Sequence, residues 1–381
     1  MTKLMFTTAV VARLPLATFT IGVLVHVQHL TGSYGAAGAA AGALAIAQGA
    51  GGPALGRLAD RRGQTSVLIG ASAVAAAALA ALAACPSGAP LGVVLALAAT
   101  LGLATPPVGA CLRTLIPVLF PAGHRRGYAI DAAATELTWV AGPPLALLIG
   151  QLWGTGAALA TMGAVLLVAT ATFACCGPAR RWRPATSTRS SGSALASPTM
   201  RVLVAVLVGV GALFGATEVA VTAAAGALGS TGAAGPLIGL WGAGSLLGGV
   251  VAARLGGGAG SRRGFAVLLA LLGLGHAALG AATGSVVLLG VAIAAAGTMI
   301  APILASAYAM VDAAAPAGTS TEAFAWLATA SAVGTSIGAA TAGVLVDTAG
   351  PTCAFLLAGV AGLAAAAIAV PGAAARVPAA A

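Results

Sequence analysis

Charged residues are scarce in this sequence: Asp, Glu, Lys and Arg together make up 6% of its 381 residues. A soluble globular chain carries about 25%. Aromatic residues are also scarce, at 4%, and Lys3 is the single lysine. Such a composition excludes a soluble protein. In contrast, 60% of the residues are hydrophobic, and they form long runs of about 20 residues, the length that a membrane-spanning helix needs.

The residues that catalytic sites require are few and dispersed. Seven acids and four histidines are spread over many segments, and the five cysteines show no metal-ligand spacing. We find no clustered nucleophile, metal set or phosphate-binding loop, so the sequence predicts neither an enzyme nor a resident metal or cofactor. The longest polar stretch is too short for the soluble effector domain that a membrane sensor would carry.

The apolar runs predict an all-α membrane protein with twelve transmembrane helices. The expected spans are residues 8–30, 36–56, 65–84, 90–113, 128–150, 155–177, 202–228, 234–254, 265–283, 286–311, 321–346 and 350–371. The polar, arginine-containing stretch after the sixth span reads as a flexible linker. We therefore expect a six-helix half over 1–178, a cytoplasmic linker over 179–201 and a second six-helix half over 202–381.

The formal net charge of +10 has a topological origin. All 17 basic residues fall at alternate span ends or in alternate loops. Positive charge is retained in the cytoplasm, so this pattern places both termini in the cytoplasm and the chain in the inner (plasma) membrane. The dispersed pattern does not indicate nucleic-acid binding. We expect a monomer whose partners are the lipid bilayer and a small-molecule substrate.

The two halves show a weak internal repeat. Gly35-Ala36-Ala37-Gly38 recurs as Gly232-Ala233-Ala234-Gly235, and Arg57-Leu58 recurs as Arg254-Leu255. Gly102 with Pro107 recurs as Gly297 with Pro302 at nearly the same shift. A near-constant shift in three places indicates two six-span halves of parallel topology.

The most charged short stretch of the chain is Gly56-Arg57-Leu58-Ala59-Asp60-Arg61-Arg62-Gly63-Gln64. Three guanidinium groups cannot lie in hydrocarbon, so we expect a tight loop between spans two and three. The stretch resembles the loop signature of the major facilitator superfamily at Gly56, Leu58, Ala59, Asp60, Arg61 and Gly63. With the twelve spans and the basic linker, the resemblance covers the whole chain. It is a resemblance to the bacterial members that export drugs and metabolites.

The resemblance implies a latch at this loop. In the family the matching acid is held at the positive start of span eleven, which here implies Asp60 at residues 319–322, with Arg113 as its ion partner and Glu322 as a further latch charge. Such a contact joins the two halves when the cavity faces outward. The alternative is that the arginines only set topology.

A second motif lies in span five, at Gly142-Pro143. It resembles the Gly-Pro element that marks antiporters of the superfamily, although the glycines that follow are largely replaced here. Proline removes a backbone hydrogen bond, so we expect a bend near mid-membrane. A structural kink without a role in antiport is the alternative.

Charged residues within spans are costly and are therefore functional candidates. We expect Arg13 to pair with Asp131 or Glu136, either to fix helix packing or to handle protons. Glu218 has no basic residue nearby in sequence. An unpaired carboxyl in hydrocarbon is less costly as the neutral acid, so Glu218 is our first candidate for a proton carrier; a hydrogen-bonded structural Glu is the alternative.

In the family, spans one, four, seven and ten line the cavity. The candidates there are mostly small polar groups among apolar side chains, namely Thr105, Thr217, Thr298, Met299 and Tyr308. Such a lining suits a moderately apolar organic molecule. We therefore expect export of a drug-like molecule or metabolite by alternating access, driven by the proton gradient. The alternative is a proton-coupled nutrient importer of the same fold.

Overall fold

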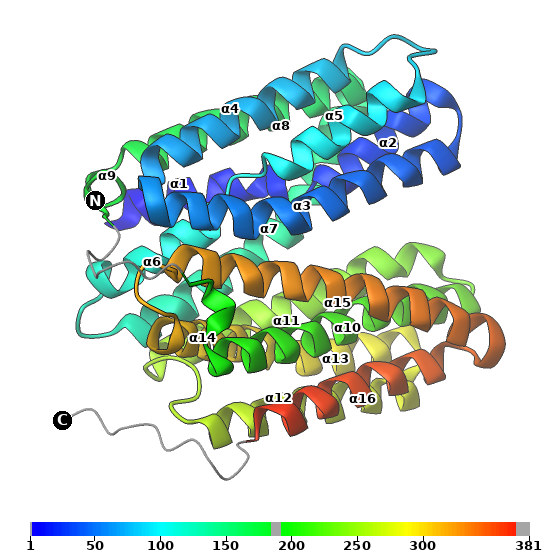
Figure 1. The fold of residues 1–381 in the computed structure, drawn as a ribbon. Helices are drawn as coiled ribbons and strands as arrows, with labels where there is room; N and C mark the ends of the chain where they lie inside the picture. The colour runs from blue at the N-terminus through cyan, green and yellow to red at the C-terminus, as the bar shows by residue number, and fades with distance from the viewer. Residues whose placement is uncertain (1, 184–191, 371–381) are drawn as a thin grey trace. The chain divides into compact units, whose positions relative to one another are not determined.

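The computed structural model describes residues 2–183 and 192–370, and these residues form helices joined by short connections, with no β-strand among them. The chain divides into two compact units (Figure 1). Unit 1 comprises Met1–Met200 with Tyr308–Thr329, and unit 2 comprises Arg201–Ala307 with Ala330–Ala381. The short segment Tyr308–Thr329 therefore clusters with the first half of the chain, although it belongs to the second half by sequence.

Unit 1 is built from the helices of the first half and the adjoining ends of α14 and α15. In chain order they are α1 (Thr2–Leu16), α2 (Phe19–Thr31), α3 (Tyr34–Arg62), α4 (Gln64–Ala83), α5 (Leu91–Leu103), α6 (Val108–Leu119), α7 (His124–Trp153), α8 (Thr155–Cys175), the short α9 (Gly177–Arg181) and the 3₁₀ turn η1 (Ala194–Ala196). Within this unit α4 packs along α8 and α3 packs along α5 (Figure 1).

Unit 2 contains most of the remaining helices. They are α10 (Pro198–Ala227), η2 (Thr231–Ala233), α11 (Ala234–Arg254), α12 (Arg262–Ala278), η3 (Leu279–Ala282), α13 (Val286–Gly297), α14 (Ile300–Ala314), α15 (Ser320–Ala349) and α16 (Pro351–Ala369). Within it α12 packs along α16 and α11 along α13. The expected spans reappear with shifted ends, because several helices continue past the apolar run into polar residues.

Eleven segments of the described chain are long and apolar enough to cross a membrane. The helix α3, at 29 residues, is long enough to be the twelfth. The many glycines of α3 lower its mean hydropathy below that of the eleven segments, and for this reason α3 is not counted with them.

Three expected spans are interrupted rather than continuous. Proline accounts for two of the interruptions, because it lacks the N–H that a helix needs. The fourth span breaks at Pro106 and Pro107, whereas the first breaks between α1 and α2, two residues after Pro15, which lies inside α1. The tenth breaks at Thr298, whose carbonyl would be paired with the nitrogen of Pro302 in a regular helix.

Equivalent glycine contacts occur in the two halves, each within its own unit. A Cβ on Gly102 would meet the carbonyl oxygen of Leu44, and a Cβ on Gly297 would meet that of Trp241. The glycines are 195 residues apart and their partners are 197 apart (297−102 and 241−44). Small residues that bring helix backbones together are typical of membrane proteins, so the repeat in the sequence corresponds to a repeated packing contact.

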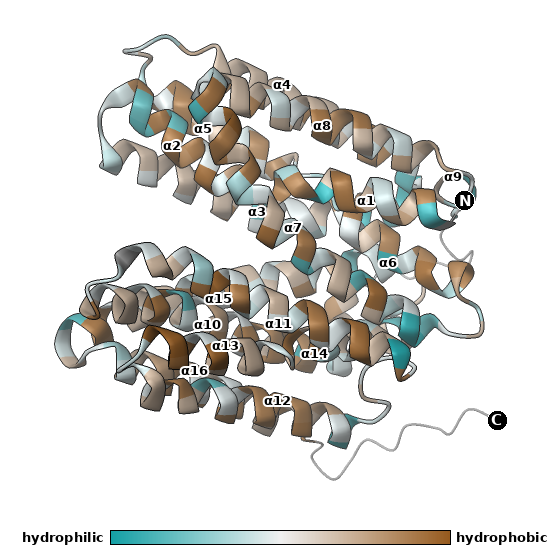
Figure 2. Ribbon diagram, turned by 180° about the vertical axis from the view of Figure 1, so that it is seen from behind, coloured by the Kyte–Doolittle hydropathy of each residue, from teal (hydrophilic) through white to brown (hydrophobic). Residues whose placement is uncertain are grey.

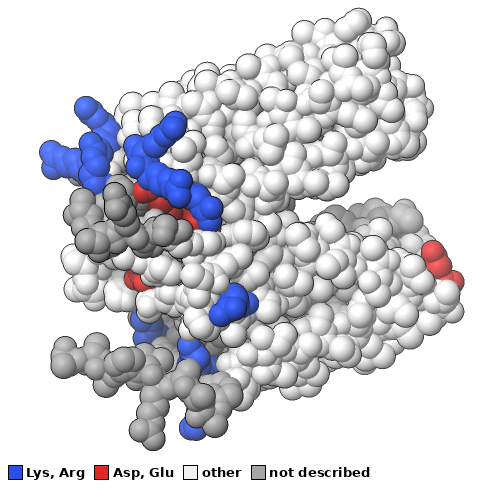
Figure 3. All heavy atoms as spheres, viewed as in Figure 1, with Lys and Arg blue, Asp and Glu red and all other residues white. Residues whose placement is uncertain are grey.

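Polar residues concentrate near the helix ends, and hydrophobic residues dominate along the helices (Figure 2). On the visible face of unit 1, the Lys and Arg side chains gather at one end of the unit (Figure 3). That distribution is the one the alternating basic loops predict. The membrane and the side on which this end lies remain predictions.

Candidate functional site

The stretch Gly56–Gln64, expected as a loop, is mostly helical. Residues 56–62 form the last two turns of α3, and α4 begins at Gln64. The single linking residue is Gly63, whose φ of 89° is strained for any residue with a Cβ. Its N–H donates to the carbonyl of Ala59. The expectation of a loop is wrong because the polar residues extend the helix beyond the apolar run instead of ending it.

The carboxylate of Asp60 lies against the first turn of α15. Its Oδ1 accepts a hydrogen bond from the N–H of Thr321 (3.0 Å), and its Oδ2 accepts one from the N–H of Glu322 (2.9 Å). First-turn N–H groups have no partner within their own helix, and the helix dipole favours a negative charge there. Asp60, 3% exposed, therefore caps α15 from a position 261 residues earlier in the chain.

Glu322 of α15 returns a contact to α3. Its carboxylate accepts two hydrogen bonds from Arg57, at 3.0 Å from Nε and 2.9 Å from Nη2. Gly56 permits this approach, because a Cβ there would lie 3.0 Å from the Glu322 Cα. We call the set Arg57, Asp60, Thr321 and Glu322 the α3–α15 contact. The hydrogen bonds to the buried Asp60 carboxylate contribute about 1.5–3 kcal/mol each, and the ion pair of the exposed Arg57 contributes less, because solvent screens it.

A shallow groove of about 460 Å³ runs beside the α3–α15 contact. Arg61 lines it together with Arg57, Glu322 and Trp326. Arg61 is exposed. It makes no ion pair within the described residues, in contrast to Arg57.

Two arginines and one aspartate form a second charged cluster deep in unit 1, the buried triad. Asp131 of α7 lies 2.8 Å from Arg13 Nη1 of α1 and 2.8 Å from Arg113 Nε of α6. Asp131 is fully buried, and the side chains of Arg13 and Arg113 are 7% and 9% exposed. Thr135, one turn along α7, accepts a further hydrogen bond from Arg13 Nη1.

The triad includes one of the two pairings expected for Arg13, that with Asp131. Arg113 pairs with Asp131 rather than with Asp60, the partner that the resemblance implied. The reason is positional. The fourth span runs to Leu119 and not to residue 113, so Arg113 lies inside the helix instead of at its end. Glu136 is half-buried on α7.

Tyr308 belongs to an aromatic cluster that the sequence did not predict. Its ring lies 3.9 Å from the Arg113 guanidinium carbon, a distance at which a cation interacts favourably with a ring face. Tyr128 and Phe324 complete the cluster, with ring centroids 6.0–6.4 Å apart. Tyr128 of α7 lies 180 positions before Tyr308 of α14 and 196 before Phe324 of α15, so no local pattern connects α7 to the other two helices.

Gly142 and Pro143 lie within α7, which continues as one helix from His124 to Trp153. A Cβ on Gly142 would lie 2.9 Å from Thr18 Cγ2 and 3.1 Å from the Leu14 carbonyl oxygen. The glycine therefore lets α7 approach the break between α1 and α2. Antiport, the function that the resemblance attaches to this element, stays a prediction.

Glu218 lies within α10 of unit 2, and its side chain is exposed on that unit. Its backbone carbonyl accepts a hydrogen bond from Thr222. No ion pair or hydrogen bond to its carboxylate occurs within the described residues. The charge is therefore unpartnered there, as its sequence context indicated.

Most cavity candidates do not present free polar groups. Thr105, Thr217 and Thr298 each donate their hydroxyl to a backbone carbonyl three or four residues earlier, at 3.0, 2.7 and 2.7 Å. Thr105 and Thr217 are buried, whereas Thr298 and Met299 are half-buried. Tyr308 is buried on Arg113. The place of these residues in a substrate cavity stays a prediction.

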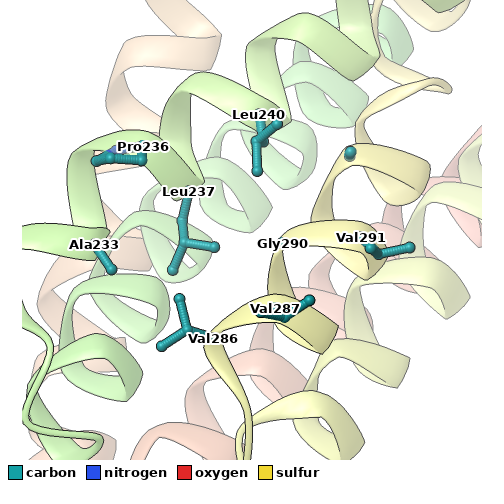
Figure 4. Close-up of a pocket in the computed structure, with 9 residues that line it drawn as sticks. Ala233, Pro236, Leu237, Leu240, Val286, Val287, Gly290 and Val291 are labelled. Atoms are coloured by element: carbon teal, nitrogen blue, oxygen red, sulfur yellow. The ribbon is translucent and has the colours of Figure 1, made fainter.

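A groove of about 500 Å³ in unit 2 lies between α11 and α13 (Figure 4). Apolar side chains of Pro236, Leu237, Val287 and Val291 line it. It contains none of the predicted site residues, and it presents no charged or hydrogen-bonding side chain.

Comparisons with known proteins address the fold and the family. The family model described as Major Facilitator Superfamily matches residues 5–256. A search of curated proteins finds no match to the sequence. The human organic anion transporter MFSD10 (TETRAN) is structurally similar, with a TM-score of 0.74 and 16% identity over 97% of this chain and 99% of that one.

Two further solved structures are similar over almost their whole length. The proton:xylose symporter XylE has a TM-score of 0.73 at 15% identity, covering 96% of this chain and 94% of that one. A bacterial homologue of the iron transporter ferroportin has a TM-score of 0.71 at 15% identity, covering 96% and 98%. At such identity the structures share the fold alone. With the family model covering most of the chain, the protein belongs to the major facilitator superfamily of membrane transporters and is not an enzyme.

Proposed function

We propose that this secondary transporter exports a small organic molecule in exchange for protons, by alternating access. The observation that carries the proposal is the α3–α15 contact. It joins a helix of the first sequence half to a helix of the second through two capping hydrogen bonds and one bidentate ion pair. Water can replace each of these polar bonds, so the contact can open and close at modest cost.

The contact acts as a gate on one side of the membrane. It lies at the arginine-rich end of α3, with Arg57, Arg61 and Arg62. Because positive charge is retained in the cytoplasm, we assign the gate to the cytoplasmic side of the inner membrane, with both termini on the same side. A closed gate then prevents the substrate from reaching the cytoplasm.

Glu218 is the proposed proton carrier. An exposed carboxyl on a membrane helix, without an ion pair in the described residues, is stable only if it can bind a proton or meet water. The buried triad has a structural part in this proposal, because both arginines already share the Asp131 carboxylate.

Two features favour export over import: the resemblance of Gly142-Pro143 to the antiporter element, and the expected cavity lining, in which a few small polar groups stand among mostly apolar side chains. The related structures carry titles of an organic anion transporter, a proton:xylose symporter and an iron transporter homologue. A fold shared by such different cargoes does not select one. We therefore base the class of a moderately apolar organic solute on this chain's own residues.

The test is a compound-resistance panel in cells with and without the protein, repeated with a protonophore. We expect resistance to at least one organic compound, abolished by the protonophore. Everted vesicles, with that compound supplied outside them as a radiolabel, then give the direction. Uptake into everted vesicles on acidification of their lumen supports export, whereas proton-driven uptake into right-side-out vesicles would favour the importer.

The Glu218→Gln variant tests the proton carrier. It should lose proton-driven transport while retaining substrate binding, because the amide cannot release a proton. Asp347→Asn is the matched control: it removes an exposed acid near the end of α15, so its transport should equal that of the parent. Unchanged pH-dependent flux in Glu218→Gln would remove Glu218 from the mechanism.

A further inference from the structure

The end of the linker is seated on unit 1 through Ser193. This residue precedes η1, and its Oγ accepts a hydrogen bond from the N–H of Leu195 (3.3 Å). The same hydroxyl donates to Oε1 of Glu322 at 2.8 Å. The adjacent Ala194 is fully buried, so this part of the linker packs against the unit.

Glu322 therefore receives hydrogen bonds from three segments. Its Oε1 accepts from Ser193, from Arg57 Nη2 at 2.9 Å and from the Trp326 indole at 3.4 Å. Its Oε2 accepts from Arg57 Nε at 3.0 Å. The two parallel hydrogen bonds from Arg57 require the Glu322 carboxylate to lie in the plane of the guanidinium group, which selects one Glu322 rotamer. Ser193 and Trp326 restrain Oε1 further.

Holding the Glu322 side chain in one orientation costs conformational entropy, and Ser193 reduces the part of this cost that falls on Arg57 binding. A Glu side chain loses rotamer freedom when it is held in one conformation. The Ser193 hydroxyl is oriented by the Leu195 N–H, and it restricts the Glu322 carboxylate before Arg57 binds to it. Only a group with both a donor and an acceptor can make these two bonds, and Ser193 supplies them.

We propose that Ser193 is a positioning residue of the gate, which holds the Glu322 carboxylate in the conformation that receives Arg57. The inference rests on the proposed function, since it assigns the linker to the gate described there. Ser193 acts through Glu322 and does not contact the substrate. The linker is then a part of the gate as well as the connection between the sequence halves.

The test measures the open and closed gate directly. Spin labels at Ser66 and Ala317, both exposed, are introduced into a full-length variant without native cysteines, reconstituted in lipid. The distance distribution between the labels by double electron–electron resonance reports the two gate states. Ser193→Ala should raise the open-to-closed ratio about tenfold, the equivalent of about 1.4 kcal/mol. Ser193→Thr, which keeps the hydroxyl, should restore the parent ratio.

Two variants distinguish this inference from its alternatives. Ser197→Ala removes another linker hydroxyl, one that accepts from the Met200 N–H, and it should leave the ratio unchanged. Asp60→Asn tests the gate itself, because an amide nitrogen cannot accept the second α15 N–H; the open fraction should rise.

Three results overturn the inference. If Asp60→Asn shifts the ratio and Ser193→Ala does not, Ser193 has no positioning role and the gate stands. If Ser193→Ala and Ser197→Ala shift it equally, the effect belongs to the linker in general. If Asp60→Asn leaves the ratio unchanged, the proposed gate fails, and this inference fails with it.

Discussion

Asp60 combines burial with hydrogen bonding to a helix start. Burial raises the pKa of its carboxyl from the usual 3.8 to about 6. The N–H donors of Thr321 and Glu322 oppose this rise, and the Glu322 carboxylate adds to it. The Glu322 carboxylate is itself paired with Arg57. When the contact opens, water reaches Asp60 and its pKa returns towards the usual value.

A pH dependence of the gate follows from this difference. Because the pKa is higher in the closed contact, the closed state binds the proton more tightly. Closure is therefore favoured as the pH falls through 6, and this contribution is lost as the pH rises above 6. We expect the open fraction of the Ser66–Ala317 labelled protein to increase between pH 5 and pH 8. Asp60→Asn should flatten the profile in this window; a larger open fraction at pH 5 would show the opposite linkage.

The buried triad predicts a large stability effect at Asp131. Asp131→Asn leaves Arg13 and Arg113 buried without their shared counter-charge, and breaking a buried ion pair costs about 3–5 kcal/mol. The melting temperature of the purified protein in detergent should fall accordingly. Asp347→Asn, at an exposed position, should change stability by no more than about 0.5 kcal/mol. Equal melting temperatures for the two variants would show that the triad does not stabilise the fold.

At the scale of the helices, glycine decides how closely neighbours approach. A Cβ on Gly51 of α3 would lie 2.5 Å from the Leu103 carbonyl oxygen, and a Cβ on Gly248 of α11 would meet the carbonyl oxygen of Thr298. These are equivalent positions in the two sequence halves (248−51 and 298−103 differ by 197 and 195). Both helices therefore use glycine to pack against the end of a broken helix.

Alanine at these positions should separate the helices. We expect Gly51→Ala and Gly248→Ala each to lower the melting temperature, because the contact atom is backbone and cannot rotate away. Gly38→Ala on the exposed side of α3 has no atom within 4 Å of its new Cβ. It should be neutral or stabilising by up to about 1 kcal/mol, the difference in helix propensity. The close packing would be refuted if all three variants melted alike.

At the scale of the whole molecule, the apolar runs were sufficient to predict the helices, and the proline positions explain where two of them break. The motif around Asp60 predicted that this carboxylate lies at the start of α15, and the structure contains that contact. The same motif failed for Arg113, because its helix continues six residues beyond the expected end. Helix ends are set by capping and tertiary contacts, which an apolar run does not encode.

Other parts of the site have no signal in the sequence. Tyr128, Tyr308 and Phe324 meet only because distant helices bring them together. Ser193 is one hydroxyl in a linker rich in Ser and Thr, so nothing local distinguishes it.

The most direct test of the account is whether the α3–α15 contact must open during transport. Gly52 and Thr329 face each other across it: a Cβ on Gly52 would lie 3.5 Å from Thr329 Oγ1. In a background without native cysteines, Gly52→Cys with Thr329→Cys should form a disulfide on oxidation. We predict that oxidation stops transport, that reduction restores it, and that neither single variant responds. Full transport by the cross-linked protein would contradict the gate.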